Sequence, residues 1–221
     1  MNTWEIMESR HSVRQYLNQP VAQETRSLLD HYIEEINTQG NLHLQVFYDE
    51  PECFNSRLAH YGHFENVTNY IAVVGEKARD LDERCGYYGE KAVLKLQELG
   101  LNSCWVALTH GRSKTILKPS EKEVIIIAFG YGRNQGFAHR NKDLSSLCNL
   151  SDSSPEWFRK GMEAVLLAPT ATNQQKYRFT LLDNQKVKAE TSGIGPYLKL
   201  DLGIVKYHFE LGSEKDASIF V

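Results

Sequence analysis

The stretch Ser9–Tyr16 contains the residues of this chain best suited to bind an anion. It places a serine between two arginines, at Arg10, Ser12 and Arg14, with His11 beside them. Arginine offers a fixed fork of hydrogen-bond donors and serine a small adjustable hydroxyl, and together they suit a phosphate monoester. Residue types alone favour the alternative, which is solvated surface charge. A phosphate site therefore needs support from elsewhere in the chain.

A second polar stretch, Ala168–Gln175, follows an apolar helical pattern and is rich in residues that form turns. The side chains in it that could contact a ligand are Pro169, Thr170, Thr172 and Asn173. The alternative is a turn that only ends the helix. A basic pair, Arg140 and Lys142, follows a buried strand that ends in Gly130–Gly132. This pair is equally compatible with a solvated basic tail.

Together these segments resemble the nitroreductase family, whose members hold FMN at the seam of an α+β dimer. The passage Leu96–Trp105 agrees, since it looks like that family's turn from an amphipathic helix into a strand. The resemblance implies an α+β fold, with a central, mostly antiparallel sheet flanked by helices. A single-chain pseudo-dimer is compatible with it.

The resemblance also implies roles for the candidate residues. Arg10 and Ser12 would contact the phosphate and the ribityl chain with His11 alongside, and Arg14 would lie near the flavin N1 and C2 carbonyl. A cation there stabilises the negative charge of the reduced flavin and raises its reduction potential. Arg140 and Lys142 would complete the phosphate site. The remaining four candidates would line the other flank of the flavin: Pro169, Thr170, Thr172 and Asn173.

The implied activity is a ping-pong oxidoreductase, in which NAD(P)H reduces FMN and a nitroaromatic or quinone then accepts the electrons. The cofactor carries the difficult chemistry, so no catalytic side chain is expected. One alternative is a non-catalytic flavin-binding or flavin-storage protein. The other is a phosphate-handling module without flavin.

The order of the segments departs from the usual family pattern. In typical members the small-residue loop follows the second helix, where this chain has Asn37–Gly40. Here a helix, loop and strand occur twice, and only the second copy carries that loop. We therefore expect an N-terminal nitroreductase-like half over 1–150 and a C-terminal half over 151–221 that completes the flavin site. One FMN per chain, in a monomer or loose homodimer, would follow.

Hydrophobic periodicity and turn residues predict the secondary structure. Thr3 is expected to cap the first helix, and Gly40 to end the second in a left-handed conformation, with Leu28 on its buried face. By resemblance, Gly86 and Gly89 would let the flavin ring approach a central helix. The predicted helices are 3–7, 20–40, 86–100, 143–147, 156–167 and 198–211. The predicted strands are 42–48, 67–75, 103–108, 124–130 and 177–182.

Composition and charge limit the remaining classes of function. The 221 residues are 41% hydrophobic and 24% charged, which is typical of a globular protein. A net charge of −3 gives no general attraction for nucleic acid or anionic lipid, and no apolar run is long enough to cross a membrane. We therefore expect neither nucleic acid nor a membrane as a partner.

The cysteines and histidines indicate a location and argue against a metal. Four cysteines are scattered without a Cys-x-x-Cys pair, and the N-terminus has no apolar signal region, so a reducing cytoplasm is expected. Cys53, His60 and His63 come nearest to the spacing of metal ligands. They lack a second ligand pair, so a surface loop is favoured and no metal is expected.

Overall fold

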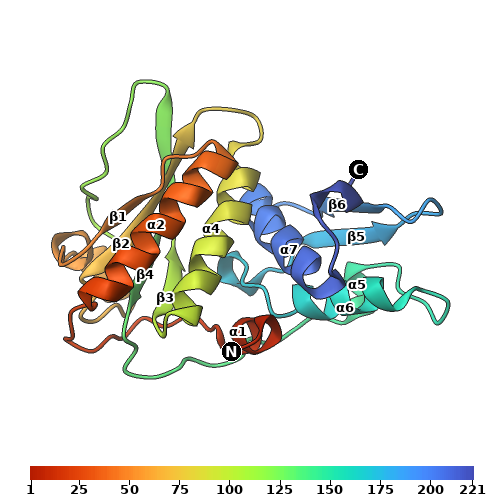
Figure 1. The fold of residues 1–221 in the computed structure, drawn as a ribbon, viewed down its shortest axis with the longest axis horizontal. Helices are drawn as coiled ribbons and strands as arrows, with labels where there is room; N and C mark the ends of the chain where they lie inside the picture. The colour runs from red at the N-terminus through yellow and green to blue at the C-terminus, as the bar shows by residue number, and fades with distance from the viewer. The chain divides into compact units, whose positions relative to one another are not determined.

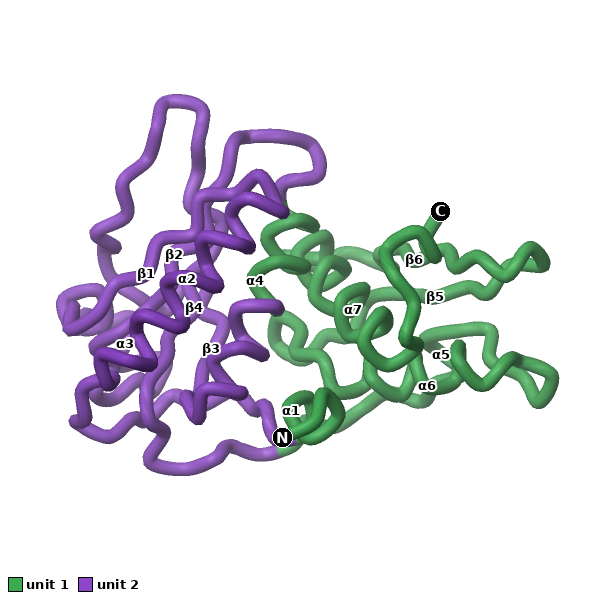
Figure 2. The backbone as a smooth tube through the Cα atoms, in the orientation of Figure 1, with its two compact units in different colours: residues 1–8, 82–90, 138–221 green, residues 9–81, 91–137 purple.

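The computed structural model describes residues 1–221 and contains two compact units (Figures 1 and 2). The sheet unit comprises residues 9–81 and 91–137, and the helical unit comprises residues 1–8, 82–90 and 138–221. The predicted domains, 1–150 and 151–221, stay a prediction, because this division of contacts does not show which segments fold independently. The predicted pseudo-dimer likewise stays a prediction.

The sheet unit is built on four antiparallel strands in the order β1-β2-β4-β3. The strands are β1 (Gln45–Phe47), β2 (Asn69–Glu76), β3 (Asn102–Val106) and β4 (Glu121–Gly130). The expected α+β fold with an antiparallel sheet is confirmed. The apolar run that predicted an interior strand lies in β4, which pairs with β2 on one side and β3 on the other. Strands buried on both faces need such runs.

Helix α2 (Gln23–Gly40) buries Leu29, Ile33 and Ile36 on one face, as its periodicity predicted. Two details of the prediction are wrong. Leu28 is exposed, because it lies outside the arc that these three residues share. The left-handed residue that ends the helix is Asn41, at φ 46°, and Gly40 is still helical. Asparagine tolerates this conformation better than most residues.

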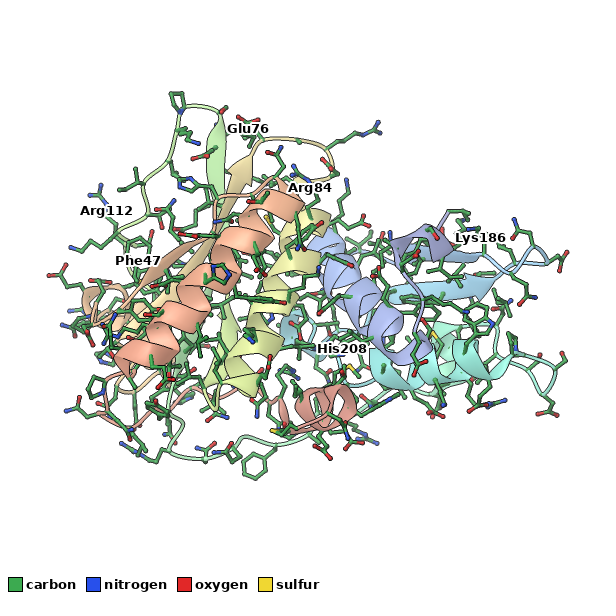
Figure 3. The ribbon with its side chains drawn as sticks, viewed as in Figure 1. Phe47, Glu76, Arg84, Arg112, Lys186 and His208 are labelled. Carbon is green, nitrogen blue, oxygen red and sulfur yellow. The ribbon has the colours of Figure 1, made fainter.

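A loop region of the sheet unit carries η1 (Glu52–Phe54) and α3 (Arg57–Tyr61). Phe54 and Phe64 pack with their ring centroids 5.1 Å apart, and Phe47 stacks on Tyr70 at 4.8 Å. Figure 3 labels Phe47 on β1. No group of three or more His, Cys, Asp or Glu side chains in residues 1–221 could hold a metal ion.

The helical unit packs several helices and a two-stranded hairpin around aromatic side chains. Phe179 stacks on Phe209 at 5.2 Å, and Phe158 meets Phe209 edge-on at 5.8 Å. The hairpin strand β6 was not predicted from the sequence. It is only five residues long, and two of these residues, Lys188 and Glu190, are charged. Helix α4 (Leu81–Glu98) is shared, with residues 82–90 in the helical unit and the rest in the sheet unit. The other elements of the helical unit are α1 (Thr3–Ser9), α5 (Leu144–Leu147), α6 (Glu156–Val165), β5 (Tyr177–Leu181), β6 (Val187–Thr191), α7 (Leu198–Ser213) and the short turns η2 (Ala171–Asn173) and η3 (Ala217–Ile219).

Helix α2 begins three residues after the predicted start at Pro20, and two further helix starts also differ from the prediction. The cap of α1 is Asn2, not Thr3: Asn2 Oδ1 accepts from Glu5 N at 3.0 Å, and Glu5 Oε2 accepts from Asn2 N at 2.9 Å. This reciprocal pair satisfies two backbone donors at once. Helix α4 begins at Leu81, five residues before the predicted start, with Asp82 and Glu83 in its first turn. Acidic residues stabilise that end of a helix.

Gly86 of α4 and Gly203 of α7 allow these two helices to touch through their backbones. A Cβ at Gly86 would overlap the Leu200 carbonyl oxygen, and one at Gly203 would overlap the Glu83 carbonyl oxygen. The expectation that Gly86 makes room for a flavin is therefore wrong, since α7 occupies that space. None of the helices combines the length and the hydrophobicity that a membrane span requires.

Candidate functional site

The stretch Arg10–Tyr16 is held in place by backbone hydrogen bonds within the sheet unit. Val13 N donates to Ser103 O of β3 at 2.9 Å, and Ser12 bridges to the same residue. Further along, Tyr16 N donates to Glu65 O at 3.0 Å, and Glu65 N donates back to Arg14 O at 3.0 Å. The backbone that carries the predicted anion ligands therefore runs beside the edge strand of the sheet in a fixed path.

Two side chains of this stretch anchor it to the core. Val13 and Tyr16 are each 1% exposed, and Tyr16 OH donates to Val13 O at 2.6 Å. His11 is half-buried, with Nδ1 3.1 Å from Gln135 O. The neighbouring Gly136 has φ +69°, and a Cβ there would lie 2.6 Å from His11 Cβ, so only glycine fits.

Arg10, Ser12 and Arg14 gather around the buried thiol of Cys104 on β3. Burial raises the pKa of that thiol, whereas Arg14, a hydrogen bond with Ser12, and Arg10 act in the opposite direction. Ser12 therefore contacts the thiol, and both arginines are near enough for their charges to act on it. The structure therefore brings together three of the predicted ligands. Cys104 itself was not predicted as part of the site, although it lies in the passage Leu96–Trp105 that resembles the family.

The two arginines of this group differ in their surroundings. Arg10 is 4% exposed, whereas Arg14 is exposed and its guanidinium makes no hydrogen bond or ion pair within the chain. By contrast, the exposed Arg133 of the same unit is paired with Glu65 at 2.9 Å. Arg14 therefore offers all of its donors to a ligand, on a backbone that is already ordered.

The helical unit brings the other two groups of predicted residues together. Asn173 Nδ2 donates to Arg140 O at 2.8 Å, and Gln175 Nε2 donates to the same carbonyl at 2.9 Å. Lys142 Nζ donates to the carbonyl oxygens of Gln174 at 2.8 Å and Gln175 at 3.0 Å. The amide of Asn173 and the ammonium of Lys142 thus order the loop, a use that the sequence did not predict.

The loop Thr170–Gln175 contains three residues with a left-handed backbone. Thr172, Asn173 and Gln175 have φ values of 51°, 54° and 43°. Such a conformation costs a non-glycine residue roughly 1–2 kcal/mol, most for the β-branched threonine. Pro169 and Thr170 are half-buried, and Thr172 is exposed. Strain of this kind persists where surrounding contacts over-determine it, often at ligand sites.

Asp201 of α7 supplies two of these contacts. Its Oδ1 accepts from Ala171 N at 2.9 Å, and its Oδ2 accepts from Gln174 Nε2 at 2.8 Å. The side chain is 2% exposed. The sequence signal that could have found it is a lone carboxylate between Leu200 and Leu202, since a buried acid needs partners.

A pocket of about 480 Å³ lies in the sheet unit, next to the backbone of the Arg14–Tyr16 segment. Phe54 and Phe64 form its apolar wall, and Glu65, Asn66 and Arg133 contribute polar groups. Asn66 Nδ2 also donates to Tyr16 O at 3.2 Å. None of the predicted site residues lines this pocket, and it was not predicted from the sequence.

Comparison with known proteins adds a family and a fold. The family model described as "Putative TM nitroreductase" matches residues 2–213. The crystal structure of a "putative nitroreductase" from Thermotoga maritima MSB8 superposes with a TM-score of 0.69 and 25% identity, over 96% of this chain and 83% of that one. A nitroreductase family protein from Clostridium difficile 630 has a TM-score of 0.51 and 21% identity, over 70% of this chain and 100% of that one.

A third structure, from Desulfovibrio desulfuricans, is of a "putative nitroreductase in complex with FMN". It has a TM-score of 0.54 and 18% identity, over 70% of this chain and 99% of that one. No curated protein matches the chain. At these identities the second and third structures indicate a shared fold.

Proposed function

The chain belongs to this nitroreductase family, and we propose on that premise that it is an FMN-dependent oxidoreductase. The proposed electron donor is NAD(P)H, and the proposed acceptor is a nitroaromatic or a quinone, in a ping-pong cycle. When bound, FMN would supply a hydride acceptor that no side chain provides. The four cysteines are unpaired, which supports a reducing cytoplasm as the place of reaction.

The observation that carries the proposal is the placement of Arg10, Ser12 and Arg14 around Cys104, on a backbone fixed to the sheet. Two guanidinium groups and a hydroxyl fit a phosphorylated ligand. We propose that Arg10 and Ser12 bind the phosphate and the ribityl chain, with His11 beside them. Arg14, which has no acceptor within the chain, would bind the N1 and C2 carbonyl edge of the ring and stabilise negative charge there.

We propose that the C-terminal residues contact the same flavin, so that one chain binds one FMN as a monomer or loose homodimer. Arg140 is exposed and adds positive charge. Lys142 orders the loop through two of its three donors, which leaves one for an anion. The proposed loop contacts are Pro169, Thr170, Thr172 and Asn173.

The experiment is to purify the protein, record its visible spectrum and add NADH or NADPH without oxygen. A flavin spectrum that bleaches with a reduced nicotinamide and returns with a quinone or nitroaromatic supports the proposal. A flavin that neither nucleotide bleaches indicates the non-catalytic flavin-binding or storage alternative. Failure of the flavin-free protein to bind added FMN contradicts the proposal.

A further inference from the structure

The carboxylate of Asp201 connects α7 to the loop Thr170–Gln174 through both of its oxygens. Oδ1 accepts from the backbone N–H of Ala171, and Oδ2 accepts from the side-chain amide of Gln174. Hydrogen bonds to a charged acceptor are about twice as strong as neutral ones. The loop is therefore tied to a buried helix at two points, one at each side of its left-handed residues.

These contacts require the ionised form of Asp201. Gln174 Nε2 donates to Asp201 Oδ2 and also to Pro196 O at 2.8 Å, so both amide hydrogens are engaged. Turning the amide over would point its oxygen at the Pro196 carbonyl. A protonated Asp201 carries a donor on one oxygen, which would then face the donor of Ala171 or Gln174. The ionised form of Asp201 thus stabilises the observed conformation of the loop.

We propose that Asp201, as a carboxylate, is the positioning residue that holds the Thr170–Gln174 loop in its flavin-binding conformation, so that flavin affinity depends on its charge. This inference rests on the proposed function, because it takes the loop to be part of the flavin site. The left-handed Thr172 and Asn173 lie between the two contacts, and without these contacts the loop relaxes to a less strained conformation.

The charge of Asp201 changes within an accessible pH range. Burial raises its pKa to about 6, against the hydrogen bonds from Ala171 and Gln174, which lower it. Tyr177 on β5 is an ionisable group that the charge of Asp201 reaches: burial first, and then that charge, raise the pKa of the phenol. Lys142 approaches the same loop from the preceding segment. Protonation of Asp201 below pH 6 should release the loop.

The test compares FMN dissociation constants of the wild type and Asp201→Asn between pH 8 and pH 5. The FMN phosphate also titrates near pH 6, so the ratio of the two constants at each pH is the quantity to follow. At pH 8 the variant should bind at least about tenfold more weakly, as for loss of one charge-assisted hydrogen bond. At pH 5 the ratio should approach one. Asp183→Asn, an exposed aspartate of the β5–β6 turn, should match the wild type throughout.

A ratio near one at pH 8, or one that is the same at every pH, would overturn the inference and leave the proposed function standing. Gln174→Met removes the donor to Oδ2 and should also weaken FMN binding. It tests the same contact independently, in case Asp201→Asn does not fold.

A second readout needs no flavin. Amide hydrogen exchange over residues 171–175 of the flavin-free protein at pH 7 should be faster in Asp201→Asn than in the wild type or Asp183→Asn. If the wild type binds no FMN, the proposed function fails, and this exchange decides whether Asp201 orders the loop. Unchanged exchange contradicts that ordering.

Discussion

Nε2 of His208 lies 2.9 Å from Oε1 of Glu90, and neither side chain has any exposed surface. Nδ1 of the same imidazole lies 3.1 Å from the Ala164 carbonyl, which can only accept, so Nδ1 carries a proton. The pair joins α4, α6 and α7 within the helical unit, and Figure 3 labels His208 on α7. A buried pair of this kind makes packing of the three helices depend on both partners.

His208→Ala should destabilise the protein by roughly 3–5 kcal/mol, because it leaves a buried carboxylate without its imidazole partner. Urea unfolding measures this loss. The matched control is His31→Ala on α2, whose imidazole lies 3.3 Å from Glu35 at the surface and should cost less than about 0.5 kcal/mol. Equal losses in the two variants would show that burial of the His208–Glu90 pair is unimportant.

Gly203→Ala should lower the unfolding free energy by about 1–3 kcal/mol, because the added methyl group meets the backbone of α4, which cannot rotate away. Gly86→Ala should do the same from the facing helix. Once one methyl group has separated the helices the second meets less resistance, so the double variant should lose less than the sum. Fully additive losses in thermal or urea unfolding would contradict a shared contact.

Asp201 should make the protein less stable as pH rises from about 4 to about 6. Burial raises its folded pKa to about 6 from an ordinary value of 3.8, so the folded state binds the proton more tightly than the unfolded state. The unfolding free energy then falls with a slope of at most roughly 1.4 kcal/mol per pH unit. Asp201→Asn should remove this slope. The same slope in the variant would show that another group causes it.

Glu121 should act in the opposite direction. Burial alone would raise its pKa, but the backbone N–H of Lys118 and the imidazole of His43 outweigh burial and lower it. The carboxylate therefore stabilises the fold above its unfolded pKa of about 4.5, and this contribution is lost as pH falls through the lower folded value. Glu121→Gln should cost stability at pH 7 and progressively less below pH 4. A loss that is constant with pH would indicate packing alone.

Local patterns predicted much of the fold. The periodicity of Glu156–Leu167 and the apolar run in Val124–Gly130 placed a helix and an interior strand correctly, because short-range sequence decides which face is buried. The close approach of α4 and α7 at Gly86 and Gly203 could not be predicted, since the two helices are far apart in sequence. The same is true of Asp201, whose partners are about 30 positions away.

In the candidate site too, local sequence predicted some features, and contacts between distant segments could not be predicted. The residue types of Arg10, Ser12 and Arg14 suggested an anion site only together with other segments of the chain, and their common neighbour Cys104 depends on the path of the backbone beside β3. The sequence also could not show that the Asn173 amide and the Lys142 ammonium order their own loop. Residue type identifies a donor, and only the fold shows what it already binds.

The most direct measurement of the central claim is a titration of flavin-free protein with FMN, for the wild type, Arg14→Ala and Arg112→Ala. Arg112 is an exposed arginine of the same unit, in the loop that follows β3, and Figure 3 labels it. The account predicts one FMN per chain, with binding weakened at least about tenfold in Arg14→Ala, as expected for a charge-assisted contact, and unchanged in Arg112→Ala. Absence of saturable binding to the wild type, or equal affinities in all three proteins, would contradict it.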